Sequence, residues 1–172
     1  MGISIRGSGD SGARAPSSST PADPDMADGL VDYAQFLETV RRDYDRAEEM
    51  YKRAVEADPN NAINLGNYAV FLQYVRRDSD GAEEMYKRAV EANSEYARGI
   101  GNYADFLETV RRDYDRAEEM YQRAVEADPK YAWGLRKYAH FLQYVRHNYD
   151  RAEEMYQRFV EADHGRLFRG WS

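Results

Sequence analysis

The sequence has no cysteine among its 172 residues. This absence excludes disulfide bonds, catalytic thiolates and zinc sites built on thiolates. The sequence also lacks any run near the ~20 consecutive apolar residues that a membrane-spanning helix needs. A mean hydropathy of −0.88 favours a soluble protein with no membrane partner.

An excess of basic residues is missing as well. The chain has 24 Lys and Arg against 31 Asp and Glu, which gives a formal net charge of −7. Phosphate backbones are bound by clustered Lys and Arg. Here the basic residues alternate with acids, as in Arg41-Arg42-Asp43. The charge pattern therefore argues against nucleic acid as a partner.

Patterns that carry catalysis are absent too. There is no glycine-rich phosphate loop and no nucleophile elbow. None of the three histidines, His140, His147 and His164, has a metal-type spacing to another ligand. The recurring Glu48-Glu49 pair does not converge on one proton or metal, because neighbouring helical residues point about 100° apart. We expect no enzyme activity, no cofactor and no metal.

The sequence does contain an internal repeat, which decides the fold class. The string Ala-Glu-Glu-Met-Tyr occurs four times at intervals of 35 residues, starting at Ala47, Ala82, Ala117 and Ala152. One helix pair cannot bury both of its faces, whereas at least about three stacked copies can. Four copies are enough for a stable array.

Each repeat predicts two helices. The first has apolar residues at helical spacing: Leu30, Tyr33, Ala34, Leu37 and Val40. In the second helix, the predicted buried face comprises Ala47, Met50, Tyr51, Ala54 and Val55. Between the helices, an N-cap with a capping-box glutamate three residues later is expected at Asp45/Glu48, Asp80/Glu83, Asp115/Glu118 and Asp150/Glu153.

These residues resemble the tetratricopeptide repeat family over about five-sixths of the chain. The first helix of the family pattern is matched by Leu30, Tyr33-Ala34 and Leu37, and the second by Ala47, Tyr51, Ala54 and Pro59. The resemblance implies an all-α fold, a right-handed α-solenoid of antiparallel helix pairs. It also implies a concave groove, lined by the first helix of each pair, that takes an extended peptide or a partner's helix. The family period is 34, and we place the extra residue in the turn around Asp43.

The repeats divide the chain into three parts. Residues 1–21 have linker composition and are predicted to be a disordered N-terminal leader. Residues 22–165 hold the four repeats, at about 24–58, 59–93, 94–128 and 129–163. Residues 166–172 form a C-terminal tail after Gly165, a candidate helix C-cap. The compartment is open: cytoplasmic is the default, and an organelle such as a plastid is the alternative, since Arg6, Arg14 and the nearby serines are features of a transit peptide.

The candidate binding residues are those on the first helix of each repeat outside the apolar stripe. They vary between repeats more than the packing positions do. A binding surface would produce this variation, and so would simple drift of exposed residues. The chaperone-binding clamp of Lys and Asn is not reproduced, since Val31 and Gln35 stand at its first-repeat positions. The predicted groove residues are Asn67, Val70, Tyr74, Arg98, Asn102, Asp105, Trp133, Arg136, Lys137, His140 and Tyr144.

Three functions remain open at this stage. The first is a protein–protein interaction scaffold or adaptor that binds a partner peptide or helix in the groove. The second is a structural subunit of a larger complex or filament, assembled through the repeat ends and the convex face, which includes self-association of uncapped ends. The third is an RNA-processing scaffold of the related half-a-tetratricopeptide type. The sequence names neither the partner nor the source.

Overall fold

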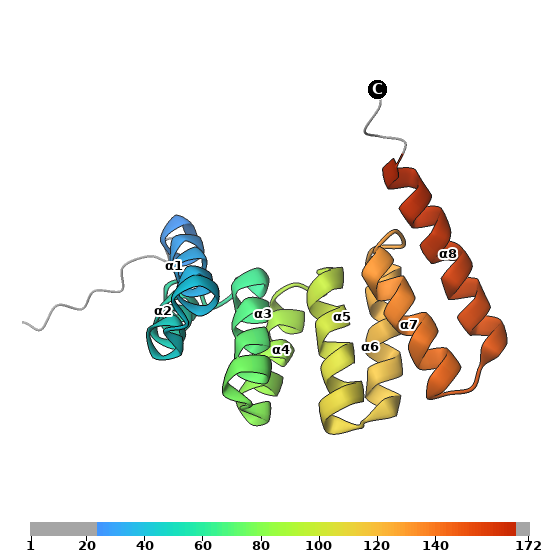
Figure 1. Cartoon of the computed structure of the whole chain (residues 1–172), viewed down its shortest axis with the longest axis horizontal. Coiled ribbons are helices and arrows are strands. Elements are labelled where there is room, and N and C mark those ends of the chain that lie inside the picture. The colour runs from blue at the N-terminus through green and yellow to red at the C-terminus, as the bar shows by residue number, and fades with distance from the viewer. Residues whose placement is uncertain (1–23, 168–172) are drawn as a thin grey trace, which may run out of the picture.

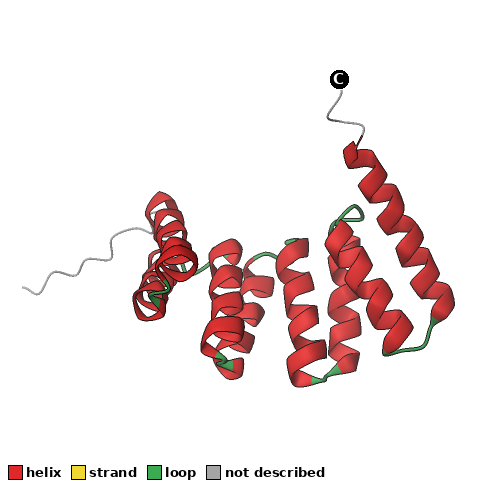
Figure 2. Ribbon diagram, viewed as in Figure 1, coloured by secondary structure: helices red, strands yellow, loops and turns green. Residues whose placement is uncertain are grey.

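Four antiparallel helix pairs follow one another along the chain (Figure 1). The computed structural model describes residues 24–167, a range that contains no strand (Figure 2). The predicted all-α solenoid is therefore confirmed. The first helices, here called A-helices, are α1 (Pro24–Phe36), α3 (Ala62–Phe71), α5 (Ala97–Phe106) and α7 (Ala132–Tyr144). The second, the B-helices, are α2 (Tyr44–Ala57), α4 (Ser79–Ala92), α6 (Tyr114–Ala127) and α8 (Tyr149–Leu167).

Short π-helical turns end the first three A-helices: η1 (Leu37–Arg41), η2 (Leu72–Arg76) and η3 (Leu107–Arg111). After η1, Arg42 takes a left-handed conformation with φ 57°, and the Asp43 N–H donates to the Leu37 carbonyl at 3.0 Å. A π-turn holds one more residue than an α-turn. It accounts for the 35-residue period, so the extra residue lies in the last turn of the A-helix, just before the position predicted.

The predicted N-caps of the B-helices are wrong by two residues. The side chains of Asp43, Asp78, Asp113 and Asn148 accept the capping hydrogen bonds, at 3.0–3.2 Å from the N–H three residues later. The left-handed residue turns the chain so that the next residue is non-helical, and Tyr44 is already in the helix. Asp45 instead forms an ion pair with Arg76 of the next repeat, at 2.7 Å.

Replacing Asp78 with alanine should lower the free energy of unfolding by about 1 kcal/mol, the usual loss for an N-cap. Asp78 is the cleanest site because its hydrogen-bond donor, the N–H of Gly81, belongs to a residue without a charged side chain. Asp80→Ala is the matched control, and its loss should stay below about 0.5 kcal/mol because the side chain is exposed. Urea unfolding of both variants checks this, and a larger loss for Asp80→Ala would restore the original assignment.

Aromatic rings join each repeat to the next. Tyr51 of α2 stacks on Tyr68 of α3 with ring centroids 5.6 Å apart and contacts Phe71 at 5.0 Å. The same trio recurs at Tyr86/Tyr103/Phe106 and at Tyr121/Tyr138/Phe141. Because the rings come from adjacent repeats, they bury a continuous core along the array.

An arginine beside each aromatic trio adds a charged contact between repeats. The Arg111 guanidinium donates to Glu83 at 2.7 Å and to Asp80 at 2.6 Å, and lies 5.5 Å from the Phe106 ring centre. Arg76 and Arg146 make the corresponding ion pairs. We call this arrangement the arginine clamp.

Burial at the first repeat departs from the predicted apolar stripe. The side chains of Tyr33 and Val40 are 41% and 63% exposed, whereas Tyr68 is 7% exposed. Tyr68 is covered by Tyr51 of the preceding B-helix, and no described helix precedes α1. The Tyr33 position is therefore buried only when another repeat comes before it, whereas the Val40 position is not, since Val110 is still 38% exposed.

The C-terminal helix also departs from prediction. α8 runs to Leu167, so Gly165 is not a C-cap. Earlier B-helices end at Ala57, Ala92 and Ala127. The first and third of these ends are followed by Asp-Pro, whereas residues 163–165 contain no proline to stop the helix. Residues 1–21 and 168–172 lie outside the described range.

Candidate peptide-binding groove

The A-helices lie next to one another along one side of the array. Helix α1 contacts α3, α3 contacts α5, and α5 contacts α7, while each B-helix packs against the A-helix of its own pair (Figure 1). The A-helix face is defined here as the side chains of α1, α3, α5 and α7, with η1, η2 and η3, that stay at least partly accessible. Every predicted groove residue lies on these helices or in their terminal turns.

Four of the predicted residues meet at one place on the A-helix face. The Lys137 ammonium of α7 donates to Asp105 Oδ1 of α5 at 2.5 Å, and the Tyr74 hydroxyl of η2 donates to Asp105 Oδ2 at 3.5 Å. The Lys137 nitrogen also lies 5.3 Å from the Trp133 ring centre. We call these four residues the Asp105 cluster: Tyr74, Asp105, Trp133 and Lys137. The cluster connects three consecutive repeats.

Asp105 itself was predicted as an accessible groove residue, but it is only 7% exposed. Its carboxylate lies beneath the Lys137 and Tyr74 side chains that bond to it. Trp133 is also half-buried. Its ring packs so closely on Gly101 that a Cβ atom added there would lie only 3.1 Å from it. The accessible part of the cluster therefore consists of Tyr74, Lys137 and one part of the indole.

Glu108 extends the cluster toward the core. Its Oε2 accepts a hydrogen bond from the Tyr121 hydroxyl at 2.7 Å. Burial raises the pKa of the Glu108 carboxyl, and the charge of Asp105 raises it further, whereas the Tyr121 hydrogen bond and the charges of Lys137 and His140 lower it. The A-helix face thus combines two carboxylates with a lysine in a partly desolvated setting.

The remaining predicted residues lie on both sides of the cluster. His140 contacts the rings of Tyr144 and Tyr156 at 5.8 and 5.9 Å, and Tyr144 is 66% exposed. Arg136 is exposed, and Arg98 is exposed with its Nε donating to the Tyr96 hydroxyl at 2.8 Å. Asn102 is half-buried.

A hollow of about 470 Å³ between α1 and α3 holds the other two predicted residues, Asn67 and Val70. Phe36 and Val40 also line it and were not predicted as groove residues. Phe36 is exposed because no described helix lies before the first repeat, whereas its counterparts Phe71, Phe106 and Phe141 are buried. The remaining lining residues are Asp32, Gln35, Glu38, Thr39, Tyr51 and Phe71.

Neither a metal cluster nor a membrane helix is found in the part of the chain that the structure describes. No three His, Asp or Glu side chains in it are grouped to hold an ion. No described helix is both long and apolar enough to cross a bilayer.

Two family models match the chain, both described as tetratricopeptide repeat, over residues 70–132 and 42–61. No curated protein matches the chain. Among solved structures, a MamA crystal structure superposes with a TM-score of 0.68 at 16% identity, covering 85% of this chain and 83% of that one. PilF of Pseudomonas aeruginosa gives 0.70 at 23% identity, covering 81% and 62%.

A third similar structure is the first tetratricopeptide domain of Spaghetti (RPAP3) bound to the HSP90 peptide SRMEEVD. It superposes with a TM-score of 0.62 at 20% identity, covering 72% of this chain and 96% of that one. These structural likenesses establish the fold. The two family models, and not these likenesses, support a tetratricopeptide repeat protein.

Proposed function

We propose that this protein is a non-catalytic interaction module that binds an extended peptide, or a partner's helix, along the A-helix face. The observation that carries the proposal is the Asp105 cluster. Tyr74 of η2 and Lys137 of α7 both bond to the buried Asp105 of α5, and the Trp133 indole lies beside the lysine. Partly buried Trp and Tyr side chains of this kind are typical anchors in protein interfaces.

The charges along the A-helix face suggest which way a peptide would lie. The charged residues that line the hollow between α1 and α3 are acidic, with Asp32 exposed and Glu38 half-buried. At the α7 end the accessible charges are basic, with Arg136 exposed and Lys137 half-buried. A ligand with basic residues near α1 and acidic residues near α7 matches both ends, and such complementarity fixes orientation and register.

The ligand class is supported by the RPAP3 domain, whose solved structure holds a short peptide. The HSP90 sequence itself is not the ligand we expect here. Chaperone-binding members grip the peptide carboxylate with a Lys and Asn clamp, and this chain has Val31 and Gln35 at those first-repeat positions. Val31 is buried and so cannot reach a ligand.

A peptide-display selection against the purified chain tests the proposal. Selected peptides should bind in fluorescence polarisation, and Arg136→Glu combined with Tyr144→Ala should weaken them at least about tenfold. Both side chains are exposed, so the fold should persist in circular dichroism. Lys130→Glu, an equal charge change in the exposed α6–α7 turn, is the matched control. Selection of no peptide, or equal loss in the control, would refute groove binding.

A further inference from the structure

The two ends of the array carry complementary surfaces that are bare in the described structure. Tyr33 and Phe36 at the N-terminal end are 41% and 42% exposed, while their counterparts Tyr68 and Phe71 are buried. At the C-terminal end, Val160 of α8 is 49% exposed, whereas Val125 of α6 is buried. The N-face is the outer side of α1 and η1 together with Arg46 of α2, which bonds to Tyr33, and the C-face is the outer side of α8.

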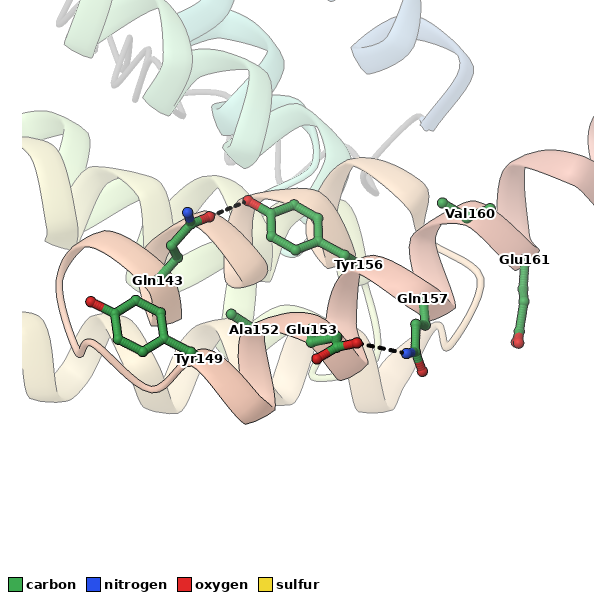
Figure 3. A pocket seen from close by; sticks show the side chains of 8 residues that line it. All are labelled: Gln143, Tyr149, Ala152, Glu153, Tyr156, Gln157, Val160 and Glu161. Carbon is green, nitrogen blue, oxygen red and sulfur yellow. Dashed lines mark hydrogen bonds between the residues drawn. The ribbon is translucent and has the colours of Figure 1, made fainter.

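The C-face contains a hollow of about 530 Å³, larger than the one in the groove (Figure 3). The residues that line it include Tyr149, Ala152, Glu153, Tyr156 and Val160. Tyr156 occupies the position of Tyr51, Tyr86 and Tyr121, the rings that stack on the next repeat. The hollow is therefore where the A-helix of a following repeat would sit.

The N-face and the C-face carry the charged residues that form the arginine clamp inside the array, where a second arginine also reaches the glutamate. Inside the array, Glu83 receives both Arg111 and Arg116 of the next repeat, at 2.7 and 3.4 Å. Glu118 receives Arg146 and Arg151 in the same way, at 2.7 and 3.1 Å. Each of these two junctions thus joins one glutamate on a B-helix to two arginines of the repeat that follows.

The ends hold the two halves of one more such clamp. Glu153 and Asp150 lie on the C-face, and both are exposed. Arg41 and Arg46 lie on the N-face, and both are exposed. Arg41 already lies 5.7 Å from the Phe36 ring centre, the same distance that Arg76 keeps from Phe71 inside the array. The basic half is thus preorganised for its acidic partner.

We propose that the C-face of one copy binds the N-face of a second copy, so that the chain associates head to tail. Tyr156 would stack on the partner copy's Tyr33 and Phe36, and Glu153 would receive its Arg41 and Arg46. The contact joins two different surfaces, so it does not close on itself and gives an open polymer that continues the solenoid.

Phe159 limits the strength of this contact. It occupies the position of Ala54, Ala89 and Ala124, each at most 1% exposed. The Phe159 ring is half-buried and packs against the core of its own chain, and it does not line the hollow. A second copy would nevertheless meet a larger side chain here than any internal repeat does, so the association is weaker than the internal contacts.

Sedimentation velocity over a concentration series tests the proposal on the full chain. The average mass of the wild type should rise with concentration. Arg41→Glu and Glu153→Arg should each weaken association at least about tenfold, since a like charge would then face a like charge. An equimolar mixture of these two variants should associate again, because the intact N-face of one meets the intact C-face of the other.

Phe159→Ala should strengthen association, on the order of tenfold, by restoring the alanine found in the other repeats. Lys130→Glu is the charge control and should behave as the wild type. A chain that stays monomeric throughout the series overturns the proposal, as would happen if another segment of the same chain covered α8. Failure of the mixture to associate overturns the head-to-tail arrangement.

Discussion

Tyr121→Ala should lower the free energy of unfolding by about 4 kcal/mol, within the usual range for removing a buried aromatic ring. The Tyr121 side chain is fully buried and its ring lies 5.9 Å from that of Tyr138 and 5.4 Å from that of Phe141. Its hydroxyl also satisfies the half-buried Glu108 carboxylate. Truncation removes the two ring contacts between the third and fourth repeats and the hydrogen bond to Glu108 within the third. Calorimetry or urea unfolding measures the loss.

Two controls separate the ring from its setting. Tyr121→Phe keeps the ring and loses only the hydrogen bond to Glu108, so it should cost about 1–2 kcal/mol. Tyr156→Ala removes the same ring at the same repeat position, where no described repeat follows, and should cost less than half as much as Tyr121→Ala. Equal losses for Tyr121→Ala and Tyr156→Ala would mean that the ring stabilises its own repeat rather than the junction.

Uncoupling of the repeats is a second readout of Tyr121→Ala. In a solenoid, stability is a sum of repeat terms and nearest-neighbour terms. Weakening the junction between α6 and α7 should therefore let the last helix pair unfold before the others. We expect the urea transition to broaden or split in this variant, and to remain single in Tyr121→Phe.

The helix pairs could be predicted because the repeat supplies the same signal four times. The details at the helix junction could not. Asp43 and Asp45 are both good N-cap residues, and only the left-handed Arg42 decides between them. No glycine marks the left-handed position, which arginine holds in three repeats and His147 in the fourth. A positive φ at these residues leaves no trace in the sequence.

The groove residues were partly predictable for a related reason. Spacing places Tyr74, Asp105 and Lys137 on A-helices, but it does not give the contacts between helices. Asp105 varies between repeats as a surface residue would, yet the lysine of the next repeat covers it. Tyr33 and Phe36 show the converse, because their repeat position is buried wherever another repeat precedes it. In both cases the neighbouring repeat decides exposure.

Raising the pH should unfold this protein cooperatively before about pH 12, because its buried tyrosines bind their protons more tightly in the folded state. Burial is the largest cause that raises the pKa of Tyr68 to about 12 and of Tyr103 to about 12, with further contributions from nearby carboxylates. Burial also raises the pKa values of Tyr51, Tyr86 and Tyr121. An unfolded tyrosine titrates near pH ~10.

The sign follows from proton linkage. A pKa raised in the folded state contributes stability that is complete below about pH 10 and is lost as the pH rises through the folded value. Each of these phenols then costs about 1 kcal/mol by pH ~11 and about 2 by pH ~12. Five of them together approach ~10 kcal/mol, comparable to the whole stability of a typical domain.

The measurement follows tyrosinate absorbance and helical circular dichroism in one alkaline titration. Ionisation of the buried phenols should coincide with loss of helix, since they are released only on unfolding. Tyr68→Phe should lose about 1 kcal/mol less stability than the wild type between pH ~8 and ~11, because it removes one of the linked protons. Full ionisation with the helix intact would show that the A-helix and B-helix rings are reached by solvent, contrary to their packing between repeats.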